Sequence, residues 1–362
     1  MQVTPVESRG VAFRGTVWAG GTTTPYDGAV VVDDRGRVAA IGPGTALPEG
    51  LRVLGGEGYW VGPGLVDAHV HLAFGDAAAA LRGGVVAVRD LGAPLERACA
   101  WRSGSRPAPG RATVSVAGPV VTAPDGYPSQ SWGADGFAMF LPGAETARTL
   151  VDRLAAAGVD VVKVALEPAG GAPVVTPAAL RALVDAAHAR GLPVTAHALT
   201  VGMVRRALDA HVDELAHTPV ELLPDDLVDR IAATGIPVVS TLQCLIAGDR
   251  STDGAAAAAN AAALHSAGVA LLYGTDLGNT GTRPGADPRE LDRLADAGLG
   301  RAGALRAATE GSAAAAGIRA GTGRLEPGGP AALVLLAGDP LDEPAVWLAP
   351  TAVCADGYVV LP

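Results

Sequence analysis

The chain has 362 residues, of which 49% are hydrophobic and 18% are charged, and its formal net charge is −10. This composition is typical of a globular protein, and the negative charge argues against nucleic acid and anionic membrane surfaces as partners. The three cysteines lie far apart, which predicts free thiols rather than a disulfide framework or a zinc cluster. No apolar stretch suits a bilayer, and the first residues show no signal pattern. We therefore expect a cytoplasmic protein that acts on a small molecule, with a homo-oligomer left open.

Both ends of the chain have the pattern of short strands and tight turns. Residues 28–41 predict a β-hairpin, and residues 332–361 contain further apolar strands. Neither end is long enough to build a hydrophobic core alone. We therefore expect residues 1–62 and 318–362 to pair into one small β-sandwich.

Residues 63–317 alternate apolar strands with helical segments. The expected strands are 65–71, 85–91, 112–117, 161–166, 194–197, 214–217, 238–242 and 271–276. The expected helices include 145–157, 177–190, 201–210, 225–233, 255–267 and 301–316. Glycines typical of helix C-caps stand at Gly158, Gly191, Gly235 and Gly268. About eight β–α units over about 250 residues predict an α/β fold of the (β/α)8 TIM-barrel type. A doubly wound sheet is the alternative, but no glycine-rich phosphate-binding turn supports it.

Lys163 is the only lysine among the 27 lysines and arginines of the chain. It lies within the apolar run 161–166, which predicts a buried strand, and a buried cation is costly. Unlike arginine, a desolvated lysine can lose its proton. A neutral lysine amine can also take up carbon dioxide and become a carbamate, which is an anionic metal ligand. A surface lysine whose amine reaches solvent is the alternative interpretation.

Residues able to bind a metal fall at the C-terminal ends of the predicted strands, where a barrel carries its active site. His69 and His71 end the first strand and face the same way, because alternate strand residues share a face. Further such residues end the fourth, fifth, sixth and eighth strands: Lys163, His197, His217 and Asp276. Taken singly, each has an ordinary interpretation as a polar core residue or a helix cap. Their joint placement predicts a metal site.

The remaining histidines lie elsewhere in the predicted pattern. His188 and His265 fall within predicted helices, and His211 follows one. None of them ends a predicted strand. We therefore expect surface or packing roles for these three.

These motifs resemble those of the amidohydrolase superfamily, in the branch of imidazolonepropionase-like enzymes and metallo-dipeptidases such as Xaa-Pro dipeptidases. The matching segments are Pro63–His71, Val88–Gly92, Asp160–Lys163, Val194–His197, Asp213–His217, Gly274–Asp276, Gly323–Gly328 and Leu333–Leu341. They extend over nearly the whole chain. The resemblance implies a metal-dependent hydrolase barrel with a small sandwich built from both termini.

The resemblance also implies a role for each residue of the expected metal site. His69, His71 and Asp276 would bind the more buried of two divalent ions, and His197 and His217 the more exposed one. Lys163, as its carbamate, would bridge the ions together with a hydroxide. Zinc is the expected metal, because imidazole and carboxylate ligands suit it. Asp276 would take the proton of the attacking hydroxide and pass it to the leaving amine.

The chain departs from the family pattern after the third strand. Relatives often carry a Gly-Gly-His stretch there, whereas residues 125–129 place Tyr127 at the comparable position, so Tyr127 is an expected substrate contact. Arg283, in the loop after Asp276, would hold a substrate carboxylate by a bidentate contact, with a plain surface arginine as the alternative. The tail has Ala332 where relatives usually have aspartate, and we expect little effect on function.

The expected function is therefore binuclear, metal-dependent hydrolysis of an amide, peptide or lactam C–N bond, with dipeptide-like or N-acyl amino-acid substrates. A mononuclear deaminase or imidazolone-type ring hydrolase is the alternative. Deaminases tend to carry a glutamate soon after the His197 position, and residues 198–200 contain no acid. A one-metal enzyme also has no need of Lys163. A lactone or phosphoester hydrolase on the same site stays open. A non-catalytic scaffold is disfavoured, because such proteins usually lose ligands.

Overall fold

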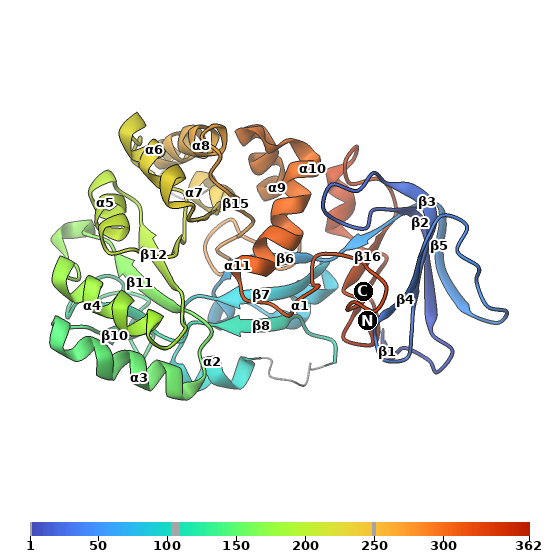
Figure 1. The fold of residues 1–362 in the computed structure, drawn as a ribbon, viewed down its shortest axis with the longest axis horizontal. Helices are drawn as coiled ribbons and strands as arrows, with labels where there is room; N and C mark the ends of the chain where they lie inside the picture. The colour runs from blue at the N-terminus through green and yellow to red at the C-terminus, as the bar shows by residue number, and fades with distance from the viewer. Residues whose placement is uncertain (1, 103–108, 248–250) are drawn as a thin grey trace.

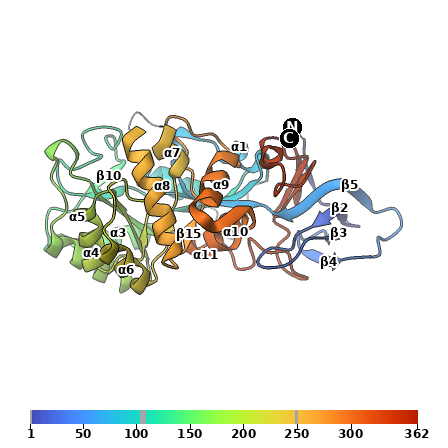
Figure 2. The same ribbon diagram turned by 90° about the horizontal axis from the view of Figure 1, so that it is seen from above.

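The fold was analysed in a computed structural model, which describes residues 2–102, 109–247 and 251–362. Figure 1 shows two parts: a barrel of strands surrounded by helices, and a sheet at one end that contains both termini. The two ends of the chain lie side by side in this view and in the view from above (Figure 2). Among the described residues, no helix has the length and apolar character needed to cross a membrane.

The sheet at the termini has eight strands, drawn from both ends of the chain. In sheet order they are β1 (Gln2–Pro5), β18 (Tyr358–Leu361), β17 (Ala352–Ala355), β16 (Leu333–Leu336), β5 (Arg52–Pro63), β2 (Val11–Val17), β3 (Tyr26–Val32) and β4 (Val38–Gly42). Side chains of seven of these strands bury one shared core, which includes Phe13, Val30 and Leu335. This sharing confirms the prediction that the two ends form one small β-sandwich, since neither end alone could bury these side chains.

The strands of the barrel are parallel and follow one another around it. They are β6 (Leu65–Val70), β7 (Val85–Asp90), β8 (Thr113–Val116), β11 (Val162–Leu166), β12 (Val194–Ala198), β13 (Glu214–Leu215), β14 (Val238–Val239) and β15 (Leu271–Leu272). Backbone hydrogen bonds also join the two remaining pairs of neighbours. Asp160 N, just before β11, donates to Val116 O on β8 at 2.8 Å, and Ala68 N on β6 donates to Tyr273 O, just after β15, at 3.0 Å. The predicted barrel is confirmed. Two short strands, β9 (Val120–Thr122) and β10 (Ala138–Phe140), were not predicted.

Several predicted strands extend further than the observed ones at their C-terminal ends. The predicted strand 238–242 stops at Val239, because Thr241 has a φ of 44° and leaves the extended conformation. Asp276, in the predicted strand 271–276, likewise has a φ of 55°. Such backbone is uncommon for residues other than glycine, and for β-branched threonine it is a clear outlier. The ends of these strands therefore turn away from the barrel wall at the rim where the metal site was predicted.

Eleven α-helices pack around the barrel within the described residues. They are α1 (Ala77–Arg82), α2 (Leu95–Trp101), α3 (Ala147–Ala157), α4 (Pro177–His188), α5 (Val201–Asp209), α6 (Asp225–Thr234), α7 (Leu242–Ala247), α8 (Ser251–Ser266), α9 (Pro288–Leu294), α10 (Gly300–Arg306) and α11 (Ser312–Ala315). The four glycines predicted at helix ends all have positive φ, between 69° and 86°. The predicted helix 301–316 is interrupted by a π-helical turn at Ala307–Gly311, and Leu242 begins α7 instead of ending a strand.

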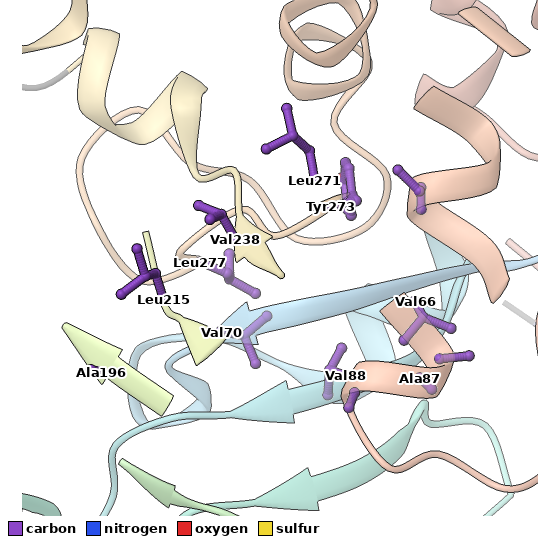
Figure 3. Packing of buried hydrophobic residues seen from close by; sticks show 14 of the residues in the cluster. Val66, Val70, Ala87, Val88, Ala196, Leu215, Val238, Leu271, Tyr273 and Leu277 are labelled. Atoms are coloured by element: carbon purple, nitrogen blue, oxygen red, sulfur yellow. The ribbon is translucent and has the colours of Figure 1, made fainter. Parts of the chain in front are cut away.

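Aliphatic side chains of the barrel strands belong to one large hydrophobic core, which also includes side chains of the surrounding helices. Figure 3 shows that side chains from β6, β7, β13, β14 and β15 lie close together, among them Val70, Val88 and Leu215. All three are fully buried. A core packed at this density holds the strand ends in fixed positions, so side chains at the rim have a rigid support.

Candidate metal centre

The six residues predicted to bind metal come together at the C-terminal rim of the barrel. His69 is on β6 with His71 just after it, Lys163 is on β11, His197 is on β12, His217 follows β13, and Asp276 follows β15. Five of the six line one cavity, and His69 lies behind it, fully buried.

Asp276 lies at the centre of the group. Its Oδ1 is 3.4 Å from His69 Nε2 and 3.3 Å from His71 Nε2, and its Oδ2 is 3.9 Å from His217 Nδ1. The backbone amide of Asp276 donates to His69 O at 2.8 Å, which joins this loop to β6. Burial alone would raise the pKa of the Asp276 carboxyl, but the three histidines hold that pKa well below its usual value. Asp276 is therefore an ionised carboxylate.

The imidazole rings form a continuous cluster beside this carboxylate. Ring centroids are 4.5 Å apart for His69 and His217, 4.7 Å for His197 and His217, and 5.3 Å for His69 and His71. Burial is the main cause that lowers the pKa values of His69, His197 and His217, and Lys163 lowers them further. Asp276 opposes this lowering at all three rings, and Glu167 opposes it at His197. These three imidazoles are therefore neutral, which is the form that binds a metal ion.

Several buried polar atoms of this group have no hydrogen-bond partner among the residues that the structure describes: His69 Nε2, His71 Nδ1, Lys163 Nζ and Asp276 Oδ1. Lys163 is only 3% exposed, and burial lowers its pKa to about 7. An unsatisfied buried polar group costs about 1–3 kcal/mol, and native proteins contain few of them. Their concentration at one rim indicates a site built for a group that the chain itself does not supply.

Asp67 joins two of the elements that carry the site. Its carboxylate accepts hydrogen bonds from His69 N at 3.1 Å, from Thr275 N at 3.0 Å and from Thr275 Oγ1 at 2.5 Å. Asp67 therefore holds β6 against the loop that carries Asp276. The sequence contains Asp67 within the motif before His69. Nothing in its spacing predicted a contact with Thr275, which follows β15 at the place where the last strand of the barrel meets the first.

The rings of His69 and His217 are each oriented by a contact of the Nδ1 atom. His69 Nδ1 lies 2.8 Å from Ala216 O, and His217 Nδ1 lies 3.1 Å from Thr241 Oγ1. Metal-binding histidines commonly use their other ring nitrogen in this way, which sets tautomer and orientation. His69 matches this pattern, because the Ala216 contact leaves its Nε2 facing Asp276.

Glu167 and Cys244 are among the residues near the site that the sequence interpretation missed. Glu167 follows β11, and its Oε2 lies 3.3 Å from His197 Nε2. Cys244 on α7 lies with its Sγ 3.7 Å from Asp276 Oδ2, and burial raises the pKa of the thiol. The one available signal for Glu167 was an acid four residues after Lys163, directly after an apolar strand. Cys244 gave no such signal. The predicted strand ended at residue 242, so the helix α7 that carries Cys244 was not expected.

The cavity has a volume of about 240 Å³ and is bordered by aromatic as well as polar side chains. Tyr127 lines it, with its ring 5.3 Å from the His197 ring. Burial raises the pKa of Tyr127 to about 12, so its phenol is neutral. Arg283 is half-buried and is not among the residues that line this cavity. Tyr127 therefore borders the cavity and Arg283 does not, and a substrate contact stays a prediction for both.

Gly274 allows two strands to approach each other at the site. A Cβ atom at this position would lie 2.3 Å from Val239 Cγ1 and 3.1 Å from His69 Cβ. The glycine of the segment Gly274–Asp276 is therefore required by space, since any side chain would push β15 away from His69.

The three remaining histidines lie outside this centre. His188 is paired with Asp213 at 2.9 Å on the surface, His211 is exposed, and His265 is on α8. These positions agree with the surface and packing roles expected for them.

The sequence profile of the amidohydrolase family matches residues 60–360 of this chain. An imidazolonepropionase of Myxococcus xanthus (strain DK1622) is 46% identical over 56 residues, a segment that spans 14% of this chain and 13% of that relative. A solved structure of a candidate prolidase from Bifidobacterium longum is 28% identical, with a TM-score of 0.83 over 99% of this chain and 95% of that one. A Xaa-Pro dipeptidase with bound methionine is 20% identical, with a TM-score of 0.83 over 98% of this chain and 100% of that one, and shares the fold.

The profile covers the whole barrel and all but the last residue of the C-terminal strands, and it includes every residue of the metal centre described above. The long structural matches agree with it over the whole chain. The chain therefore belongs to the amidohydrolase family and is an enzyme of the hydrolase class.

Proposed function

We propose that the protein is a binuclear metal-dependent hydrolase that cleaves the C–N bond of an amide, peptide or lactam. The observation that carries this proposal is the set of unpartnered buried atoms at the barrel rim, namely those of His69, His71, Lys163 and Asp276. The match to the candidate prolidase supports a peptide-like substrate.

The donor atoms fit divalent metal ions. One ligand atom each of His69, His217 and Asp276 lies within 4.8 Å of the others, and all three residues are buried. Neutral imidazoles and an ionised carboxylate are the ligands that zinc prefers, so zinc is the proposed metal. We assign His69, His71 and Asp276 to one ion and His197 and His217 to a second.

Lys163 is proposed to bridge the two ions as a carbamate. Its amine is buried, and the lowered pKa of about 7 leaves much of it neutral at neutral pH. The amine nitrogen would form a bond to the carbon of carbon dioxide and release one proton, which leaves a carbamate with a single negative charge. This anion would offset the repulsion between the two cations.

When bound, the two ions supply Lewis acidity at the scissile carbonyl and lower the pKa of a water molecule towards about 7. The chain's own residues would manage the protons. Asp276, which is ionised, would accept a proton on its carboxylate and deliver it to the leaving nitrogen. The phenol oxygen of Tyr127 accepts from Trp132 Nε1 at 3.1 Å, so its own hydrogen is available to a substrate oxygen.

A one-metal ring hydrolase of the imidazolone type is the second candidate. The short matching segment from the imidazolonepropionase favours it. The burial of Lys163 at the rim with an unpartnered amine argues against it, because a single ion needs no bridging anion. A lactone hydrolase would use the same two-metal arrangement and differ in its substrate alone.

Metal analysis of the purified protein tests the proposal. We expect about two divalent ions per chain, and a loss of at least about 10³-fold in kcat/KM for Lys163→Arg, since arginine forms no carbamate. His188→Asn, which alters a surface histidine outside the centre, should keep both ions and full activity. A fully active protein with one ion per chain would refute the two-metal mechanism and favour the one-metal candidate.

A further inference from the structure

Aromatic residues are scarce in this chain, at 4% of the sequence, yet four of them gather beside the metal centre. Phe74, Tyr127 and Trp132 line the cavity, and Phe137 packs behind Phe74. These four residues are called the aromatic wall. They come from two separate segments, the turn after β6 and the loop between β9 and β10.

Trp132 holds the aromatic wall together. Its ring centroid lies 4.9 Å from that of His71, 6.3 Å from Tyr127, 6.4 Å from Phe74 and 6.1 Å from Phe137. All four pairs meet edge to face within the distances that favour aromatic contacts. Phe74 is nevertheless 54% exposed, which makes it one of few large hydrophobic side chains in the described chain that face solvent.

The aromatic wall is fixed in place by its surroundings. Phe74 N donates to His71 O at 3.0 Å, and Thr122 Oγ1 donates to Tyr127 O at 2.6 Å. Gly92 has no side chain, and a Cβ there would lie 3.0 Å from the His71 ring and 3.2 Å from Trp132. The rings are therefore held before a ligand arrives, which lowers the entropy lost on binding.

The cavity is small, and no arginine contributes to its lining. Among the described residues that line it, none is an arginine, and Arg283 is not among them. A volume of about 240 Å³ is smaller than the usual range of about 300–1,000 Å³ for drug-sized ligands. The bound group must therefore be small.

We infer that the substrate is a small amide with an aromatic or other planar ring next to the scissile bond, and that this ring lies against Trp132 and Tyr127. The inference rests on the proposed C–N hydrolase function and names its substrate class. Trp132 and Tyr127 would then be the specificity-determining residues of the enzyme.

Titration calorimetry of the metal-loaded enzyme tests this directly, with benzamide, butyramide and N-acetylglycine as probes. We expect benzamide to bind about tenfold more tightly than butyramide or N-acetylglycine, neither of which carries a ring. Trp132→Leu should reduce the ratio between benzamide and butyramide to less than about threefold. Phe74→Leu, at an exposed position, should reduce it in the same direction. Phe140→Leu, an exposed aromatic residue outside the cavity, should leave it unchanged.

Butyramide or N-acetylglycine binding as tightly as benzamide would overturn the inference, as would an unchanged ratio in both Trp132→Leu and Phe74→Leu. Turnover of matched amides separates it from the proposed function. Hydrolysis of acyclic amides with no preference for a ring would refute the substrate class and leave the C–N hydrolase standing. Ring-selective binding without hydrolysis of any amide would support the aromatic site and refute the hydrolase.

Discussion

Two buried polar clusters in the same barrel differ in how their atoms are satisfied. In the first, Arg89 donates to Ala68 O at 2.9 Å, to Ala315 O at 3.1 Å and to Glu214 Oε1 at 2.5 Å. Thr195 Oγ1 also donates to Glu214, at 2.6 Å. The second cluster is the metal centre, whose His197 lies two residues after Thr195 on β12. Four of its buried atoms have no hydrogen-bond partner among the described residues.

The comparison shows that residue type and burial do not distinguish a structural cluster from a functional one. Arg89, Glu214 and Lys163 are all charged residues buried to a similar extent. What differs is whether the chain supplies the partners. A buried ion pair with every hydrogen bond made holds strands together, whereas a set of unpartnered atoms indicates an external ligand.

Lys163→Met would break the second cluster and give the largest effect. Activity should fall at least about 10³-fold, because the bridging anion is lost. The free energy of unfolding of the metal-free protein should rise by about 1–3 kcal/mol, because a buried amine without a partner is removed. Urea unfolding after chelation measures this. A lower stability of the metal-free variant would mean that Lys163 has a structural partner and that the contrast between the clusters is wrong.

Arg89→Met would break the first cluster and should lower the stability of the protein, whereas Lys163→Met should raise the stability of the metal-free protein. The free energy of unfolding should fall by about 3–5 kcal/mol, since Glu214 is left buried and unpaired. The double variant Arg89→Met, Glu214→Gln should recover part of this loss, which equilibrium unfolding of the three proteins would show. A loss below about 1 kcal/mol in the single variant would show that the pair contributes little to stability.

Thr241→Val tests a residue that is not expected to bind metal itself but contacts the metal-binding histidine His217. Valine keeps the shape and the β-branch at this left-handed position but removes the hydroxyl that contacts His217 Nδ1. We expect metal affinity to fall by about 10–100-fold with little change in stability. Competition with a chelator measures the affinity, and Thr241→Ser, which keeps the hydroxyl, is the control. Equal affinities for the valine and serine variants would exclude this contact as a determinant of metal binding.

Much of the fold was predictable because the barrel repeats one pattern. Strands and helices alternate along the chain, and six metal-competent residues at strand ends were enough to predict a rim site. The ends of the seventh and eighth strands were wrong, because they depend on contacts distant in the sequence. The carboxylate of Glu290 accepts from Leu242 N at 3.1 Å and Gln243 N at 2.6 Å, which begins α7 where a strand was expected.

The substrate side of the site was harder to predict than the metal side. Metal-site positions follow from strand periodicity, whereas Trp132 lies on a loop whose path is set by local turns. Its contacts with Phe74 and His71 join segments far apart in the sequence. Arg283 shows the same limit: its place after Asp276 in the sequence did not bring it into the cavity.

The pairing of the two chain ends has a consequence for how the protein folds. In the terminal sheet, Pro63 of β5 pairs with Leu333 of β16, and Gln2 of β1 pairs with Leu361 of β18. Contacts of such long sequence separation form slowly, because a very large loop must close first. A folded barrel brings residues 63 and 333 together and shortens that search. We therefore expect the sheet to form last, with its amides gaining protection from hydrogen exchange after those of the barrel.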